Sequence, residues 1–326
     1  MDTKKRALKK KINYTARGVL FYNVILVGVT LLFAVGYGVY VALNPSCAGD
    51  AGTMQKILER SLGNYAGVLS IAGVAAGLLY LGIRHRKNGY LKESFVRKKG
   101  MTPAVFGQMA CVFMSLQVLF IVGAALAEII LNQFGYSLQA SVDSAASAST
   151  DWSMFLYVGL VGPIAEELVY RGIVMQSLMS CGKGFAVGIS ALLFGVMHGN
   201  FPQGLFAVAA GVVFGYIASE YSIRWSIALH ILNNVIFSEA LGKLAKLLPE
   251  TAASVVEYGT LIGFAVLTCV IFCRKRDKIA SWWRENRPEK SMWFSALTAV
   301  WMILFFIMEF FYRVEWYQAS CIREVS

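Results

Sequence analysis

The chain has 326 residues, of which 57% are apolar and only 15% charged, and its net charge is +11. About 25% of the residues of a typical soluble domain are charged, and the mean hydropathy here is +0.58, so a soluble fold is excluded. Several apolar runs reach about 20 residues, enough to cross about 30 Å of hydrocarbon as helices. We therefore predict an all-α, polytopic transmembrane bundle of about eight or nine spans, with the lipid bilayer as a partner.

The first part of the chain begins with a strongly basic tail, residues 1–17, which we expect to be cytoplasmic. Apolar runs at 18–43, 65–83 and 103–131 are the first three predicted spans. The segment after the second span, RHRKNGYLKESFVRKKG, is again basic, and we expect His85 within it to be solvated.

The remaining spans follow a Ser- and Ala-rich stretch that lacks Lys and Arg. The fourth, 152–179, contains the segment VGPIAEELVYRG and is expected to bend at its Gly162-Pro163 step. The other predicted spans are 185–198, 205–219, 225–240, 256–273 and 292–311.

The basic residues favour one orientation in the membrane. With this set of spans, 23 of the 30 Lys and Arg lie on the side of the N-terminus and six on the other side, and Arg171 lies within the membrane. Positive charge collects on cytoplasmic loops, so we predict a multi-pass cell-membrane protein with a cytoplasmic N-terminus. No basic stripe interleaves with aromatic residues in a soluble domain, and a nucleic-acid partner is therefore not expected.

Three charged side chains stand out in the fourth span. A charge at the centre of a bilayer costs at least about 2.5–3.5 kcal/mol, so Glu166, Glu167 and Arg171 require a functional or pairing explanation. Glu167 and Arg171 are four residues apart and can pair on one helical face. Glu166 points elsewhere, with Tyr170 one turn beyond it, and is left as a carboxylate without a local cation.

Two other spans bring polar side chains into apolar surroundings. Phe194 and His198 are four residues apart in FGVMHGN, and His230 and Asn234 have the same spacing in HILNN. Two of the three histidines of the chain therefore lie within predicted spans, and together with Glu166 they form a candidate active site in an intramembrane cavity.

These three motifs resemble those of the CPBP family of intramembrane proteases, also called the CAAX protease and bacteriocin-processing or Abi family. The EExxxR motif corresponds to residues 166–171, FxxxH to 194–198 and HxxxN to 230–234. The resemblance covers about residues 150–242, which would be the catalytic core. It leaves 18–149 and 243–326 as flanking transmembrane segments.

The resemblance implies an endopeptidase that cleaves a membrane-associated protein or peptide precursor. Glu166 and His198 would activate the attacking water, while His230 and Asn234 would stabilise the tetrahedral oxyanion. Elementary chemistry agrees, because a carboxylate can accept the proton of water and N–H groups are suitable oxyanion donors. Glu167, Arg171, Tyr170 and Phe194 would support the site structurally.

A metal ion is the main chemical alternative. Glu166, His198 and His230 would make a three-ligand zinc site, or a site for another divalent metal, with water in the fourth position. The HExxH spacing of soluble zinc proteases is absent, however. We expect no obligatory metal, since a metal-binding Glu166 would leave the reaction without an obvious base.

Several questions stay open at the level of sequence. A non-catalytic scaffold or bacteriocin-immunity protein that binds a partner enzyme is the alternative function, and a transporter with a Glu166 proton relay is a third. The oligomeric state, the substrate and a disulfide between Cys47 and Cys321 are not determined. Counting about 1.5 Å per residue puts Glu166 and His198 about 20 Å deep but His230 only about 10 Å, so convergence requires tilted or broken helices.

Overall fold

The computed structural model describes residues 2–44, 51–137, 151–199, 201–240 and 247–321, with only the backbone for residues 2, 51, 237–240 and 312–321. Helices make up the fold, and these residues contain no β-strand. Six of the helices are long and apolar enough to cross a membrane, or up to seven if a pair bent by 61° counts as one span. The predicted all-α polytopic bundle is confirmed.

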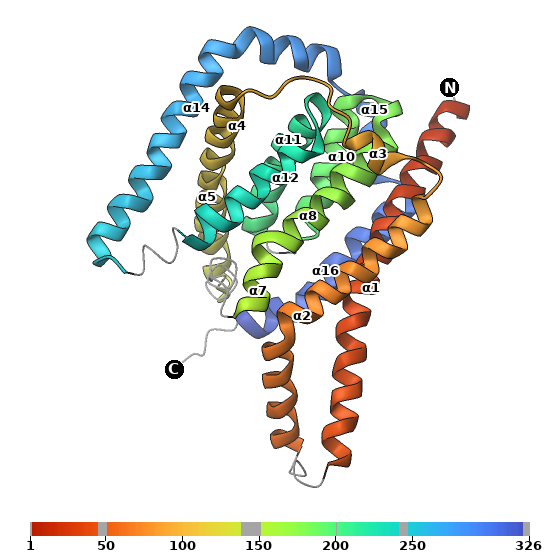
Figure 1. Ribbon diagram of the computed structural model, residues 1–326, viewed down its shortest axis with the longest axis vertical. Helices are drawn as coiled ribbons and strands as arrows, with labels where there is room; N and C mark the ends of the chain where they lie inside the picture. The colour runs from red at the N-terminus through yellow and green to blue at the C-terminus, as the bar shows by residue number, and fades with distance from the viewer. Residues whose placement is uncertain (1, 45–50, 138–150, 200, 241–246, 322–326) are drawn as a thin grey trace.

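The first two helices form a long antiparallel hairpin. These are α1 (Asp2–Leu43) and α2 (Ala51–His85), and the hairpin extends past the other helices at one end of the molecule (Figure 1). With 42 residues, α1 is about 63 Å long, roughly twice the thickness of the hydrocarbon core. Gly73 and Gly77 of α2 allow close packing, because a Cβ atom at either position would contact α1 at 3.3 Å or less.

A short helix and a pair of helices connect this hairpin to the central part of the chain. They are α3 (Tyr90–Ser94), α4 (Pro103–Ser115) and α5 (Gln117–Asn132). Thr102 caps α4, since its hydroxyl accepts the Val105 N–H, and Pro103 begins the helix where its missing N–H is harmless.

The fourth predicted span is one continuous but irregular helical run. It consists of α7 (Trp152–Leu156), η2 (Tyr157–Val161), α8 (Gly162–Glu167), η3 (Leu168–Met175), α9 (Gln176–Leu178) and η4 (Met179–Cys181). The segments η2 and η3 are π-helical and flank the two glutamates on both sides. Pro163, in the first turn of α8, cannot donate a backbone hydrogen bond, and the chain changes from π- to α-helix there.

Two of the predicted spans are not among the described helices that are long and apolar enough to cross a membrane. The helix α10 (Lys183–Val196) has 14 residues and is about 21 Å long. It pairs with α11 (Phe201–Glu220) as an antiparallel hairpin, in which Gly195 faces Val208 and Gly211 faces Ala191. The small residues let the two backbones approach closely.

The other short segment combines α12 (Ile223–Leu232) with the π-helical η5 (Asn233–Ala240). It begins at the same end of the molecule as α10, where Ser222 caps its first turn. Both segments therefore carry residues from one end of the bundle towards its middle.

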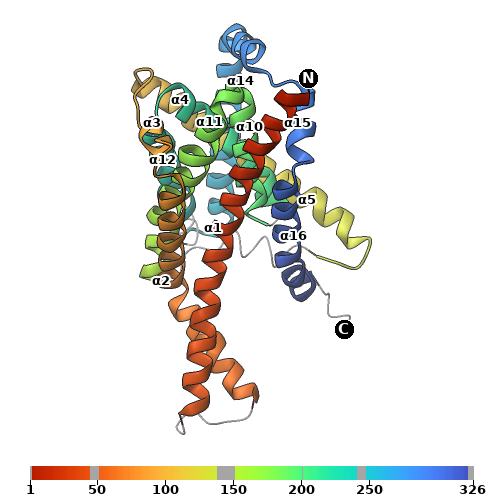
Figure 2. The same cartoon turned by 90° about the vertical axis from the view of Figure 1, so that its right-hand side faces the viewer.

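The last three helices cover the outside of the bundle. The 37-residue helix α14 (Glu250–Asn286) rises along one side and bends across the end of the molecule, and α15 (Lys290–Leu297) and α16 (Val300–Cys321) follow (Figures 1 and 2). Asn23 of α1 donates a hydrogen bond to the buried Glu309 of α16, which joins the first and last spans.

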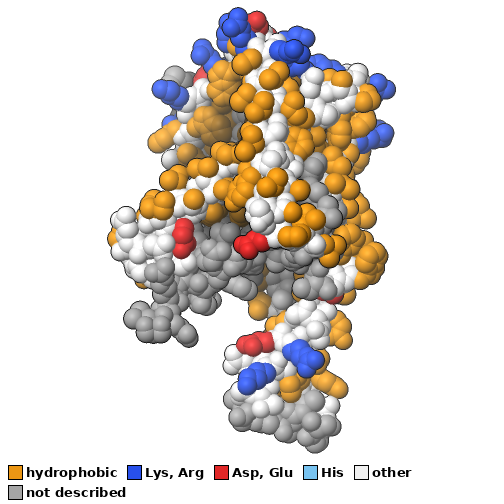
Figure 3. Space-filling view, turned by 90° about the vertical axis from the view of Figure 1, so that its left-hand side faces the viewer, with side chains coloured by type: hydrophobic (Ala, Val, Ile, Leu, Met, Phe, Trp, Pro, Cys, Tyr) orange, Lys and Arg blue, Asp and Glu red, His pale blue; other side chains and the backbone are white. Residues whose placement is uncertain are grey.

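Basic side chains gather at the end of the molecule that contains the N-terminus (Figure 3). There Glu220, only 4% exposed, accepts hydrogen bonds from Lys99, Lys183 and the indole of Trp282. The Glu220 carboxylate raises the pKa of Lys99. These hydrogen bonds connect α14 and the loop before α4 to the α10–α11 hairpin.

One expectation for this end is wrong. His85 is not solvated but is 7% exposed, and its ring packs against Tyr14 and Tyr90 with centroid distances of 5.4 and 5.6 Å. Tyr14 of α1, which runs antiparallel to α2, and Tyr90 of α3 cover the imidazole at the end of α2. The Cys47–Cys321 question lies outside the described residues and side chains.

Candidate active site

Glu167 is the centre of the buried polar site. Its side chain and that of Arg171 are both fully buried, and Arg171 Nη1 donates to Glu167 Oε1 over 2.9 Å. This is the pair that the i, i+4 spacing predicts. The same oxygen lies 3.2 Å from Nδ1 of His230, so Glu167 joins α8 to α12 as well as to η3.

Glu166 approaches the other side of the same imidazole. Its Oε2 lies 3.6 Å from Nε2 of His230, and its side chain remains 21% exposed while that of His230 is 8% exposed. The distance is slightly longer than a direct hydrogen bond. The first and third motifs therefore meet, although residue counting placed them at different depths.

Aromatic rings enclose the buried charges. The Arg171 guanidinium lies over Phe194 at 4.3 Å and over Phe214 at 5.1 Å. Phe214 also stacks on His230 with a centroid distance of 4.7 Å and an interplanar angle of 23°. Cation–π contact of this kind stabilises a desolvated guanidinium, by roughly 2 kcal/mol in favourable cases.

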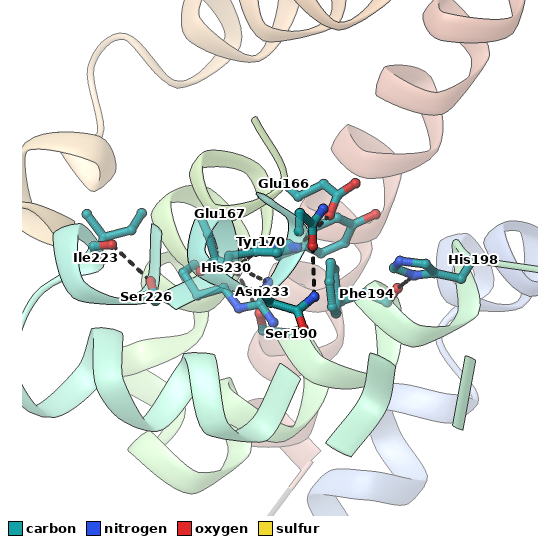
Figure 4. Close-up of polar contacts among 12 residues, drawn as sticks. Glu166, Glu167, Tyr170, Ser190, Phe194, His198, Ile223, Ser226, His230 and Asn233 are labelled. Atoms are coloured by element: carbon teal, nitrogen blue, oxygen red, sulfur yellow. Dashed lines mark hydrogen bonds and ion pairs between the residues drawn. The ribbon is translucent and has the colours of Figure 1, made fainter. Parts of the chain in front are cut away.

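His198 lies on the far side of Phe194 from His230 (Figure 4). Phe194 contacts both imidazoles edge to face, with centroid distances of 4.8 Å to His198 and 5.9 Å to His230. Nδ1 of His198 is 2.7 Å from the Phe194 carbonyl oxygen, which can only accept, so this nitrogen donates the hydrogen of the contact. The predicted Glu166–His198 meeting is not among the contacts observed; the observed partner of Glu166 is His230.

Asn234 bonds to the irregular helix that precedes the glutamates. Its Nδ2 donates to the Val158 carbonyl over 2.8 Å, and its Oδ1 accepts from the neighbouring Asn233. The π-helical segment η5 begins at Asn233, directly after α12, and so the register of Asn234 relative to His230 differs from that of a regular helix. Asn234 thus connects the third motif to η2.

Tyr170 connects the first motif to the second. It is fully buried, its hydroxyl donates to Sδ of Met197 over 2.9 Å, and its ring packs on Phe194 at 5.4 Å. Its backbone carbonyl accepts a hydrogen bond from Ser190 of α10. Tyr170 and Phe194, both assigned a supporting role from the sequence, are packing residues between η3 and α10.

Sequence reasoning missed Phe214, Ser190 and Asn233. Asn233 had a signal, because it follows His230 by three residues and can share a helical face with it. Phe214 had none, since it lies in an evenly apolar helix and only the fold brings it onto His230 and Arg171. Ser190 likewise lies in an apolar helix.

The residues do not form a three-ligand metal site. Among the described residues, no group of three or more His, Cys, Asp or Glu side chains is close enough to hold a metal ion. The Phe194 ring separates His198 from His230, and Nδ1 of His198 is directed to a carbonyl oxygen. Glu166, His198 and His230 thus do not fit the metal alternative in this conformation.

The fold and the site define a polytopic helical membrane protein with ionisable side chains at its centre. Residues 148–236 match the family model described as "Type II CAAX prenyl endopeptidase Rce1-like". A protein of Bacillus subtilis (strain 168) described as "Putative membrane peptidase YdiL" is 30% identical over 83 residues, which cover 25% of this chain and 34% of that protein. No solved structure matches. The segment with the three motifs is therefore similar to membrane endopeptidases of this type, as the motifs predict, and the match spans about a third of the length of the curated relative.

Proposed function

We propose that this protein is an intramembrane endopeptidase that hydrolyses a peptide bond in a membrane-associated protein or peptide precursor. The observation that carries the proposal is the Glu166–His230 pair: a partly exposed carboxylate beside an imidazole whose other nitrogen is bound to a buried carboxylate. The match of residues 148–236 to the CAAX prenyl endopeptidase model and the similarity to a protein described as a putative membrane peptidase support it.

In the proposed reaction Glu166 accepts a proton from the attacking water and passes it to the leaving amine. The N–H groups of His230 and Asn234 stabilise the oxyanion, which is the largest electrostatic requirement of amide hydrolysis. His198 assists Glu166 in activating the water. Catalytic hydrogen bonds tighten when substrate is bound, and the approach of His198 to Glu166 belongs to that state.

The proposal needs no obligatory metal. Glu166 is then available as the base, and Glu167 keeps its pairing with Arg171. The basic end of the molecule faces the cytoplasm in this proposal, with the N-terminus on that side of the cell membrane.

Loss of cleavage in active-site variants tests the function. Cells that produce the wild type, Glu166→Ala, His198→Ala or His230→Ala are compared for new peptide ends in their membrane fraction by mass spectrometry. Glu257→Ala, which removes an exposed carboxylate of α14, is the matched control. We expect the control to retain all wild-type products and each active-site variant to lower their yield by about 10²–10⁴-fold.

Two outcomes would contradict parts of the proposal. Identical peptide ends in all strains, with the variants folded as judged by gel filtration in detergent, would favour the non-catalytic scaffold or immunity function. Products that disappear when purified wild type is treated with a chelator, and return with added zinc, would replace the metal-free mechanism by the metal-dependent one.

A further inference from the structure

The two ring nitrogens of His230 face two different carboxylates. Nδ1 lies 3.2 Å from Oε1 of Glu167, and Nε2 lies 3.6 Å from Oε2 of Glu166. A neutral imidazole carries one proton, so these contacts decide which nitrogen donates and which accepts.

Glu167 can only accept. Its Oε1 is bound to the guanidinium of Arg171 at 2.9 Å, and both side chains are fully buried. A guanidinium stays protonated in proteins, and an ionised carboxylate has no proton to donate. The hydrogen of the His230–Glu167 bond must therefore be on Nδ1 of the imidazole.

The surrounding rings hold the imidazole in this orientation. Phe214 stacks on one face at 4.7 Å and Phe194 meets it edge on at 5.9 Å, with an interplanar angle of 90°. A half-turn of the ring would direct carbon atoms at both carboxylates and lose both contacts. The orientation is thus fixed by packing and by Glu167 together.

From these contacts we infer that Glu167 is a positioning residue for His230, in addition to its structural pairing with Arg171. It fixes a proton on Nδ1 and directs Nε2 to Glu166 at the exposed side of the site. The inference rests on the proposed function for its catalytic meaning, but its structural content is independent of any substrate.

The inference constrains the proposed chemistry. With Nδ1 protonated, Nε2 of a neutral ring is an acceptor, and it donates to an oxyanion only when the ring carries both protons. When the oxyanion forms, Glu166 holds the proton taken from water, so the negative charges of Glu167 and of the oxyanion balance the positive charges of Arg171 and the His230 imidazolium. Glu167 therefore supplies the second negative charge that an Nε2–H donor requires.

Nitrogen NMR tests the inference directly, because the chain has only three histidines. Full-length protein with ¹⁵N-labelled histidine is reconstituted in lipid nanodiscs, and the His230 signals are assigned with His85→Gln and His198→Gln variants. We expect a protonated Nδ1 for His230 in the wild type and in Glu166→Gln. An unprotonated Nδ1 of His230 in the wild type would overturn the inference.

A pair of variants separates positioning from structural support. Glu167→Gln removes the charge beside Nδ1, whereas Arg171→Lys keeps a cation next to an unchanged Glu167. We expect Glu167→Gln to alter the His230 spectrum and to lower kcat by about 10²-fold with little change in KM, while Arg171→Lys leaves the Nδ1 proton in place. Equal effects of the two variants on the spectrum and on kcat would show that Glu167 has only a structural role and does not position His230.

The two proposals fail in different ways. Absence of any cleavage by a wild type whose His230 Nδ1 is protonated would refute the protease function and leave the positioning geometry intact. Cleavage by a wild type whose His230 Nδ1 is unprotonated would support the protease function and refute the positioning role of Glu167.

Discussion

Adjacent residues of the first motif have different surroundings and hence different tasks. Glu167 is fully buried and bound to Arg171 and His230, whereas Glu166 keeps 21% of its side chain exposed. The i, i+4 rule predicted the Glu167–Arg171 pair because both residues lie on one helix. The bond from Glu167 to His230 spans 63 residues of chain, and no local rule predicts it.

Asp151 gives a test at the scale of one residue. Its carboxylate caps α7 by accepting the Met154 N–H over 2.9 Å. Hydrogen bonds from the Ser153 hydroxyl and then from this N–H lower the pKa of Asp151. A lowered carboxyl pKa means that the cap stabilises the helix above the unfolded-state pKa of about 3.9 and is lost as the pH falls through the folded value.

We therefore expect the protection of the Met154 and Phe155 amides against hydrogen exchange to fall on acidification in the wild type. Asp151→Asn, which caps without ionising, should keep its protection at low pH, and Asp151→Ala should lack it throughout. Protection factors measured at about pH 6 and about pH 3 check this, and equal acid sensitivity of wild type and Asp151→Asn would contradict it.

At the scale of elements, the site depends on segments that are not regular transmembrane helices. The α10–α11 hairpin and the short α12 bring His198 and His230 into the bundle from one end, and π-helical segments flank the glutamates. Such π segments are frequent at functional sites, because they change the direction of side chains relative to a regular helix. The sequence indicated only a bend at Gly162-Pro163 here.

The packing of α1 on α2 provides a matched pair of variants. A Cβ atom at Gly77 would lie 2.6 Å from the Tyr22 ring, whereas one at Gly82 of the same helix would have no neighbour within 4 Å. Overpacking typically costs about 1–3 kcal/mol, and replacing an exposed helical glycine by alanine gains up to about 1 kcal/mol.

We expect Gly77→Ala to lower the free energy of unfolding by about 1–2 kcal/mol and Gly82→Ala to leave it unchanged or raise it. Unfolding by SDS in mixed micelles, followed by circular dichroism, measures both. A Gly77→Ala protein as stable as Gly82→Ala would show that α1 and α2 do not pack as closely as described.

For the whole molecule, the distribution of charge relates the fold to the membrane. Lys99 and Lys183, from separate parts of the chain, meet at the basic end of the molecule, where both bind Glu220. The α1–α2 hairpin extends past the bundle at the other end (Figure 2). On the positive-inside rule, we propose that the basic end faces the cytoplasm.

Labelling of single cysteines in intact cells tests this orientation. In a cysteine-free background, Gln55→Cys lies on the exposed surface of α2 in the projecting hairpin, and Lys278→Cys lies on the exposed surface of α14 at the basic end. A membrane-impermeant maleimide should label the first in intact cells and the second only after permeabilisation. The reverse pattern would invert the proposed topology.

The sequence by itself determined the helical membrane class, the three motifs and the Glu167–Arg171 pair. Composition, run length and i, i+4 spacing act locally, so these features can be read along the chain. It did not predict that α10 would be too short to cross, that Tyr14 and Tyr90 would bury His85, or that Phe214 would stack on His230.

Only the tertiary structure decided which polar residues meet. Distance along a helix placed His230 about 10 Å nearer the surface than Glu166, yet the contact between them is 3.6 Å. The path of the short α12, the π-helical turns and the glycine-lined α10–α11 hairpin set that contact, and each depends on packing between segments far apart in sequence. Close packing fixes such arrangements because side chains must interlock across the helix interfaces.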